Sequence, residues 1–359
     1  TVDLTADTLD INGGISGDSG ITLSAGTALN ISSDLTTAGN DIVFNNPLTL
    51  DGDVQFSTGT AGGAINFTDT LNGAQLLTLV AGTGTITFAD SVGNNTPLSQ
   101  LNINSAGQVD VDSTLQVAGN IDIDAAIVNL DNTVTTTGDG SLTITNGNTL
   151  TISNMLDLDG AFDQDGTGGV NLGGDITTTA DNISFDGPIT LVGGVLLNSG
   201  SGNIDFASSA TINGRQSLGL TAVTGTIIFA GAIGATVALS GLDVNSASQL
   251  DFNASVETAG DIDIDAEIVN VTNTVTTSSG GLLTVTNSNT LTTQNTLSLD
   301  GAFNQDGGGA VNLGGNITTT ADNISFNGPV SLTSDLSLST GAGTGGNIEF
   351  SGTSTVNGD

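Results

Sequence analysis

The sequence lacks cysteine, histidine, lysine, tryptophan and tyrosine, and its only basic residue is Arg215. Without cysteine the chain can form neither a disulfide nor a thiolate metal site. Glutamate occurs only three times, whereas Thr, Asn, Asp, Gly and branched aliphatic residues are abundant. That composition favours strands and turns, so it excludes a mainly helical fold.

The formal net charge of −36 would repel nucleic acid and anionic membrane surfaces. No apolar run is long enough to cross a bilayer. We therefore expect no nucleic acid partner and no membrane span. The sequence has neither a starting Met nor a signal peptide, so we expect an internal or mature segment of a longer protein.

The chain is built from long repeats. NLGGDITTTADNISFDGP at 171–188 returns as NLGGNITTTADNISFNGP at 312–329, and Pro47, Pro188 and Pro329 are evenly spaced. Such fidelity is typical of repeat architectures. We predict one continuous solenoid over 1–359, made of superrepeats 1–141, 142–282 and 283–359, the last one partial.

A shorter period lies within the superrepeat. Phenylalanines recur at a nearly constant spacing, and Val111 and Val134 occupy the places of missing rings, while Phe56 falls outside the series. This spacing divides each complete superrepeat into six turns of ~23 residues, a length typical of solenoid repeats. Most of these rings close an alternating strand such as Ile183 to Phe185, whose apolar residues point to one side.

These periods predict an all-β fold, a right-handed parallel β-helix (β-solenoid) of about 15 coils of ~23 residues, with six coils in each superrepeat. Its strands would pair with the coils above and below, about 4.8 Å apart. A β-propeller fits poorly because its blades need about 40–45 residues. The prediction requires Phe185, Phe206 and Phe229 to be vertical neighbours in the core.

Aspartates alternate with apolar residues in three strands and would share the outward face. If successive coils bring them into register, they would favour Ca²⁺, which accepts carboxylate oxygens in flexible geometry. A hydrated acidic surface is the alternative, and the glycine-rich nonapeptide of known calcium repeats is absent. No cofactor is required. The candidate calcium ligands are Asp110, Asp112, Asp122, Asp124, Asp261, Asp263 and Asp265.

No catalytic residues are predicted, and we expect that the chain is not an enzyme. Catalysis needs one unique constellation of groups, whereas this chain repeats its carboxylates and has a single cation. Threonine triplets such as the one at 177–179 suggest ice binding, but they recur mainly with the superrepeat rather than in every coil. The phenylalanines are expected in the core rather than on a sugar-stacking platform.

The segment NGAQLLTLVAGTGTITFADSVGNNTPLSQLNINSAG at 72–107 and its partner at 213–248 resemble repeats of giant bacterial exoproteins of the filamentous-haemagglutinin and autotransporter-like β-helix type. The resemblance covers nearly the whole chain. It implies export across an outer membrane, a right-handed β-helical shaft, and a role in adhesion, biofilm or surface-layer formation.

The expected function is therefore that of a rigid acidic spacer or filament-forming segment in an extracellular or cell-surface protein. We expect head-to-tail self-association or continuation in a longer chain. Contacts with glycans or with host or neighbouring cells would use parts outside this segment. The alternative is a glycan-binding or glycan-cleaving β-helix module with a lateral groove.

Overall fold

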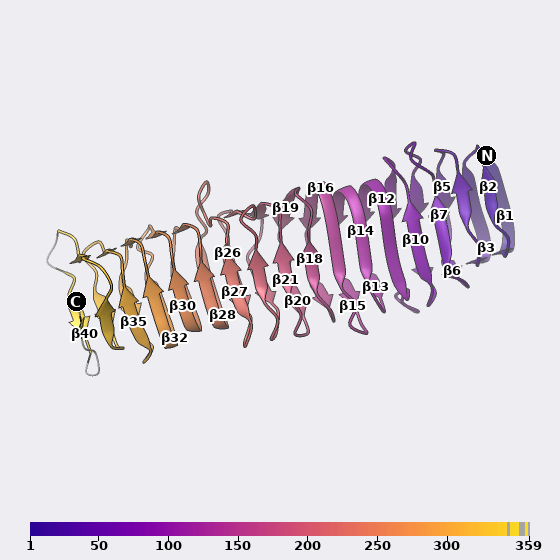
Figure 1. The fold of residues 1–359 in the computed structure, drawn as a ribbon. Coiled ribbons are helices and arrows are strands. Elements are labelled where there is room, and N and C mark those ends of the chain that lie inside the picture. The colour runs from indigo at the N-terminus through magenta and orange to yellow at the C-terminus, as the bar shows by residue number, and fades with distance from the viewer. Residues whose placement is uncertain (343–344, 352–355, 358–359) are drawn as a thin grey trace. The chain divides into compact units, whose positions relative to one another are not determined.

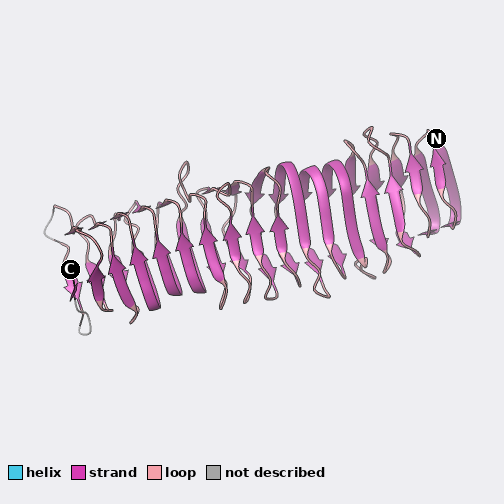
Figure 2. Cartoon of the chain, in the orientation of Figure 1, coloured by secondary structure: helices cyan, strands magenta, loops and turns pink. Residues whose placement is uncertain are grey.

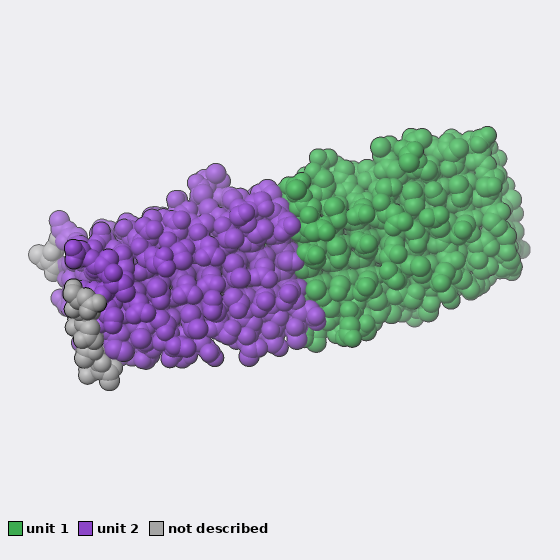
Figure 3. All heavy atoms as spheres, viewed as in Figure 1, with its two compact units in different colours: residues 1–179 green, residues 180–359 purple. Residues whose placement is uncertain are grey.

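The computed structural model describes residues 1–342, 345–351 and 356–357, and this part of the chain contains strands but no helix (Figures 1 and 2). The strands stack in parallel as a right-handed β-solenoid of about 17 turns, which confirms the predicted fold class. The chain forms two compact units, Thr1–Thr179 and Ala180–Asp359 (Figure 3). The single continuous solenoid and the superrepeat boundaries stay predictions.

The strands of the first unit are β1 (Val2–Ile11), β2 (Ile15–Gly17), β3 (Ile21–Ile31), β4 (Leu35–Thr37), β5 (Ile42–Phe44), β6 (Leu48–Leu50), β7 (Val54–Ser57), β8 (Ile65–Phe67), β9 (Leu71–Asn72), β10 (Leu76–Val80), β11 (Thr85–Phe88), β12 (Gln100–Val111), β13 (Leu115–Val117), β14 (Ile121–Leu130), β15 (Val134–Thr136), β16 (Leu142–Ile152), β17 (Leu156–Leu158), β18 (Phe162–Gln164), β19 (Gly169–Leu172) and β20 (Ile176–Thr178).

Those of the second unit are β21 (Ile183–Phe185), β22 (Ile189–Leu191), β23 (Val195–Asn198), β24 (Ile204–Phe206), β25 (Ile212–Asn213), β26 (Ser217–Thr221), β27 (Thr226–Phe229), β28 (Gly241–Phe252), β29 (Val256–Thr258), β30 (Ile262–Val271), β31 (Val275–Thr277), β32 (Leu283–Thr293), β33 (Leu297–Ser298), β34 (Phe303–Gln305), β35 (Ala310–Leu313), β36 (Ile317–Thr318), β37 (Ile324–Phe326), β38 (Val330–Leu332), β39 (Leu338–Ser339), β40 (Ile348–Phe350) and β41 (Val356–Asn357).

Each turn supplies one strand segment to each of three faces. In the first unit the chain visits Val2 on face 1, Leu9 on face 2 and Ile15 on face 3, and then returns to face 1 at Ile21. Inward aliphatic residues form a continuous column on each face, as the alternation predicts. The partners along face 1 follow one another in parallel register: Val2, Ile21, Ile42, Ile65, Ile86, Val109, Val128, Leu150 and Val170.

The turns are shorter and more numerous than the phenylalanine spacing predicts. The chain returns to face 1 eight times between Val2 and Val170, whereas coils of ~23 residues would allow only about seven returns. The predicted count of about 15 coils is therefore too low. The partner of Val111 is Leu130, whereas Val134, the next member of the predicted series, lies on face 2.

The reason is that some strands run around a corner without a loop. β14 uses its first half on face 3 and its second half on face 1, and it turns the corner through Ala125 and Ala126. A turn that needs no loop is shorter, and β14 contains no phenylalanine that would mark this turn. β12, β16, β28, β30 and β32 turn corners in the same way.

A superrepeat is therefore not a whole number of turns, and the prediction of six coils in each is wrong. Leu9 lies on face 2 of the first unit, but Leu150, its equivalent in the next superrepeat, lies on face 1. Six turns carry the chain from Leu9 to Val134 on the same face, and the two halves of β16 then carry it over two more faces to Leu150. One superrepeat thus makes six and two-thirds turns.

The second unit shows the same rotation independently. Ile183 begins a column that continues through Ile204 and Ile227. Its equivalent, Ile324, instead pairs with Ile348 in the column that begins at Val195. Within each unit, equivalent positions of successive superrepeats thus lie on different faces.

The aromatic rings form stacks in the core. The ring centroid of Phe206 lies 5.6 Å from that of Phe185 and 4.8 Å from that of Phe229, and the rings are nearly parallel. All three rings are at most 2% exposed. The predicted vertical neighbours are confirmed. Phe56, which lies outside the sequence series, packs from face 3 against Phe44 at 4.9 Å.

Asn and Asp side chains at the corners connect successive turns. Asp41 Oδ1 accepts the backbone N–H of Ala64, and Asn120 Oδ1 accepts that of Ser141. In the second unit, Asp261 Oδ1 accepts the N–H of Leu282. These bonds satisfy backbone donors where a strand begins, so the abundance of Asn and Asp reflects the needs of the corners.

Candidate functional site: an acidic groove in the second unit

An open groove of about 560 Å³ crosses one corner of the second unit, where β28, β30 and β32 bend. Small residues form its floor. Ala247 pairs with Ala266 on the next turn, and Ala266 pairs in turn with Asn287. The next turn contributes Gly307, and a Cβ there would lie 2.0 Å from the carbonyl oxygen of Asn287. Only glycine fits at that position.

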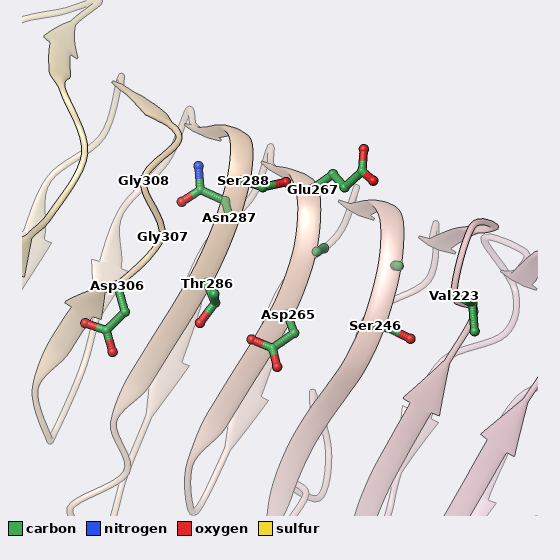
Figure 4. A pocket seen from close by; sticks show the side chains of 12 residues that line it. Val223, Ser246, Asp265, Glu267, Thr286, Asn287, Ser288, Asp306, Gly307 and Gly308 are labelled. Carbon is green, nitrogen blue, oxygen red and sulfur yellow. The ribbon is translucent and has the colours of Figure 1, made fainter.

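Polar and acidic side chains line the groove along successive turns (Figure 4). Asp265, Glu267 and Asp306 are all exposed, and Thr286 and Ser288 stand among them. The surface offers hydrogen-bond acceptors and hydroxyl groups to a polar ligand. The complete lining consists of Val223, Ser246, Ala247, Asp265, Ala266, Glu267, Thr286, Asn287, Ser288, Asp306, Gly307 and Gly308.

A buried amide pair fixes the groove from below. Gln305 Nε2 donates to Asn287 Oδ1 at 2.8 Å and to the carbonyl oxygen of Gly307. Gln305 Oε1 accepts the backbone N–H groups of Asn327 and Gly328. Because both amide side chains are almost fully buried and hydrogen-bonded, the corner has one defined conformation.

The predicted calcium ligands in the first unit do not stack on one another. Asp110 accepts hydrogen bonds from the side-chain amides of Gln108 and Asn129 at 2.8 Å. Asp122 has Asn102 on the preceding rung and Thr143 on the following one. On the rungs next to Asp110 and Asp122, amides and a hydroxyl group thus occupy the places where the calcium hypothesis needs further carboxylates.

The predicted ligands of the second unit are closer to other carboxylates. Asp263 stands on the rung after Asp243, and its pKa is raised by burial, by Asp265 and by Asp243. In the first unit, burial followed by the charges of Asp124 and Asp165 raises the pKa of Asp122. A cation bound beside such carboxylates would lower these pKa values, so the Asp243–Asp263 rung is where the calcium hypothesis is best tested.

Two further carboxyl groups are affected by burial. The pKa of Asp112 is raised by burial and then by the charges of Asp110 and Asp131, and burial raises the pKa of Asp205. Across the described part of the chain, no group of three or more acidic residues is arranged to hold a metal ion. Of the predicted ligands, only Asp265 lines the groove. Asp261 directly precedes β30, the strand of Asp265, and Asp124 lies on β14 in the first unit. Calcium binding stays a hypothesis.

Sequence reasoning missed the groove itself. It depends on the register that brings Asp306 beside residues of the two preceding turns, and the turn lengths that set this register vary. The available signal was a difference between superrepeats, because Glu267 and Val223 stand where the first superrepeat has Ala126 and Gly82.

No family model, curated protein or solved structure matches this chain. Within the residues that the structure describes, no helix is long and apolar enough to cross a membrane. The fold and the groove are thus the observations from which a function is argued.

Proposed function

We propose that this chain is a shaft segment of a large secreted bacterial surface protein, acting as a rigid acidic spacer in an adhesin, an extracellular fibre or a surface layer. One observation carries the proposal. Within each unit the strands pair in parallel with those of the turn before and the turn after, over an apolar column. Each added superrepeat would lengthen such a stack with the same contacts.

Rigidity follows from the direction of these contacts. The backbone hydrogen bonds run along the solenoid axis, and stacked rings such as Phe206 and Phe229 reinforce them. Bending would stretch many of these bonds together. A spacer of this kind performs no chemistry, so the proposed role is non-enzymatic and needs no cofactor.

The net charge favours a chain that is exposed to solvent and separate from neighbouring molecules. At −36 the chain repels its neighbours except where a specific contact forms. We place it outside the cell, in line with the resemblance to exoprotein repeats. Its end strands would add to a further copy or to a longer chain by β-pairing, and adhesion would use other parts of the whole protein.

Electron microscopy of the native protein on its source cell tests this proposal. Thin extracellular fibres labelled by an antibody against this chain are expected. Compact particles confined to the cytoplasm would contradict it. Thermal unfolding with chelator and with millimolar Ca²⁺ should give the same Tm, and a higher Tm with Ca²⁺ would instead establish a cation site.

The second candidate function is glycan binding in the acidic groove. It rests on the row of exposed carboxylate and hydroxyl groups from Asp265 to Asp306 over a preorganised floor. Calorimetry against a panel of neutral and amino sugars tests it. If a sugar binds, Glu267→Ala, which installs the residue of the first superrepeat, should weaken binding. Equal binding by this variant would exclude the groove as the site.

A further inference from the structure

The single cation of the chain stands in an apolar corner of the second unit. Arg215 is exposed and borders a hollow of about 340 Å³ together with Thr236, Val237, Ala238, Ser240 and Ala259. Parallel pairing aligns the corners of successive turns, and the N–H of Gly214 donates to the carbonyl oxygen of Val237. The guanidinium group therefore lies beside exposed apolar side chains.

Those apolar side chains are unusually exposed for this protein. Val192 is 54% exposed, and Val237 is 39% exposed. Arg215 forms no ion pair with any residue that the structure describes. We call Val192, Arg215 and Val237 the arginine patch. An arginine framed by exposed apolar side chains is a composition enriched at protein interfaces.

The equivalent corner of the first superrepeat has none of these features. Its residues are Asp51, Ala74 and Thr96 in place of the three residues of the arginine patch. The same backbone therefore exists without the apolar side chains and without the cation. It follows that the solenoid does not need the arginine patch in order to fold.

A complementary patch lies on the first unit. Met155 is 42% exposed, and it is the one large apolar side chain exposed among the described residues of that unit. It precedes Leu156, whose N–H donates to the carbonyl oxygen of Asp175, so Met155 lies next to Asp175 on the following turn. Asp157 is exposed on the same strand. We call Met155, Asp157 and Asp175 the methionine patch.

The methionine patch is specific to its place in the same way. Its equivalents in the second unit are Thr296, Ser298 and Asn316, which are all neutral and polar. One unit thus carries an apolar knob with two carboxylates, and the other carries an apolar hollow with a guanidinium group. Each patch is missing from the equivalent place in the other unit.

We propose that these patches bind each other between two copies of this chain, with Met155 of one copy in the hollow beside Val237 of the other, and Arg215 paired with Asp157 and Asp175. Methionine adapts to irregular hollows, and arginine can bind carboxylates through two parallel hydrogen bonds. The occupant is a second copy because this chain supplies both the carboxylates and the knob that the arginine patch would accept.

Each such contact uses the arginine patch of one copy and the methionine patch of another copy. It differs from pairing at the end strands, which uses neither patch. The proposal is independent of the proposed extracellular role, because it concerns two surfaces of the chain itself.

Sedimentation equilibrium of this chain at fixed ionic strength tests the contact. We expect concentration-dependent association that Arg215→Ala and Met155→Thr each weaken about tenfold. Both variants install the residue of an equivalent position, so circular dichroism should show an unchanged fold. Thr296→Ala is the matched control and should leave association unchanged. A wild-type chain that stays monomeric at ~1 mM, or equal association by all variants, would overturn the proposal.

Charge reversal gives a second test that does not depend on loss alone. Arg215→Glu and Asp157→Arg should each abolish association because like charges would face each other. Mixed in equal amounts, the two variants should associate again, since each still has the native partner for the other. A mixture that remains monomeric while the wild type associates would refute the pairing of these patches.

Discussion

The two units carry the same solenoid with different surfaces. At the corner crossed by the acidic groove, the second unit has Glu267 and Val223 where the first superrepeat has Ala126 and Gly82. The inward residues change much less, and Phe88 of the first unit and Phe229 of the second occupy equivalent buried positions. The comparison teaches that stacking determines the inward residues and leaves the outward ones free to differ.

Rotation adds to this freedom. Because a superrepeat makes six and two-thirds turns, equivalent surfaces occupy different faces, as Leu9 and Leu150 do in the first unit. The threonine triplets illustrate the consequence. In the first unit Thr177 pairs with Asp157, and in the second unit Thr318 pairs with Ser298 and with Ser339. The repeat therefore does not build the flat threonine ladder that ice binding needs.

The largest loss of stability is expected in the aromatic cores of the two units. Phe67 stacks between Phe44 and Phe88 and also contacts Phe56, whereas Phe206 stacks only between two rings. Phe67→Ala and Phe206→Ala should each cost about 3–5 kcal/mol, with Phe67→Ala the more costly by about 0.5–1 kcal/mol. Hydrogen exchange of β8 and β24 measures each loss locally.

Thr190→Ala, at an exposed position outside both patches, serves as the control and should leave the exchange rates within error. Equal protection in the wild type and in both alanine variants would show that the rings do not hold the turns together. Local exchange is the proper readout, since a solenoid unfolds in parts.

The next largest loss of stability is expected from the buried amide pair of Gln305 and Asn287. Gln305→Ala would remove the donor to Asn287 Oδ1 and the Oε1 acceptor of the Gly328 N–H, while the Asn327 N–H keeps the backbone carbonyl oxygen of residue 305. We expect a loss of about 2–4 kcal/mol, because buried polar groups without hydrogen bonds are costly. Chemical denaturation followed by the exchange of β34 and β37 would measure it. Asn304→Ala on the outward side is the control, and a similar small effect of both variants would count against the network.

The substitution of Thr293 should have a smaller effect, and it should raise stability instead of lowering it. Thr293 is almost fully buried, and its hydroxyl is the buried side-chain group without a hydrogen bond in the described part of the chain. The first unit has Ile152 at the equivalent position. Thr293→Val should therefore stabilise the fold by about 1–2 kcal/mol. Ile152→Thr should destabilise it, and a neutral result for both would mean that a hydroxyl is tolerated in this column.

The smallest effect concerns pH. Burial and the charges of Asp265 and Asp243 raise the pKa of Asp263 above its ordinary value of 3.8. Between the pKa of Asp263 in the unfolded chain and its higher pKa in the folded chain, the folded chain binds more protons. The contribution of Asp263 to the free energy of unfolding therefore falls as pH rises through this window. Asp263→Asn should raise stability at pH 7 but not at pH 3, by less than about 1 kcal/mol because the group is exposed.

The first unit provides the comparison for this pH effect. Its equivalent rung pairs Asn102 with Asp122 instead of two carboxylates. Asp243→Asn would copy that arrangement, and an NMR titration should show a lower pKa for Asp263. An unchanged pKa would mean that the charge of Asp243 does not contribute to the shift.

Much of the fold was predictable because inward residues follow a simple rule. Alternation in segments such as Ile183 to Phe185 gives the strands, and the absence of helix formers leaves parallel stacking as their means of burial. Turn length was not predictable in the same way. Leu130 and Val134 are both inward aliphatic residues, and only the corner at Ala125 decides that Leu130 lies over Val111.

The candidate site was less predictable than the fold. The alternation of the strand predicts that Asp265 is an outward carboxylate. Its neighbours on the adjacent turns depend on the residue offset between turns, which differs from one turn to the next. No single residue in the sequence indicates this offset. The partners of Asp110 show the same difficulty. Gln108 lies on the same strand, whereas Asn129 reaches Asp110 only because the intervening turn is short.

The most direct test of the account uses the absence of cysteine, since engineered pairs can form only one disulfide. Asp110→Cys with Asn129→Cys places thiols on adjacent rungs, and Asp110→Cys with Thr133→Cys places them at the spacing of the phenylalanine series. If the turn is shortened at the Ala125 corner, the first pair should oxidise rapidly to a disulfide and the second pair should not oxidise. Oxidation of the second pair alone, or of neither pair, would contradict it.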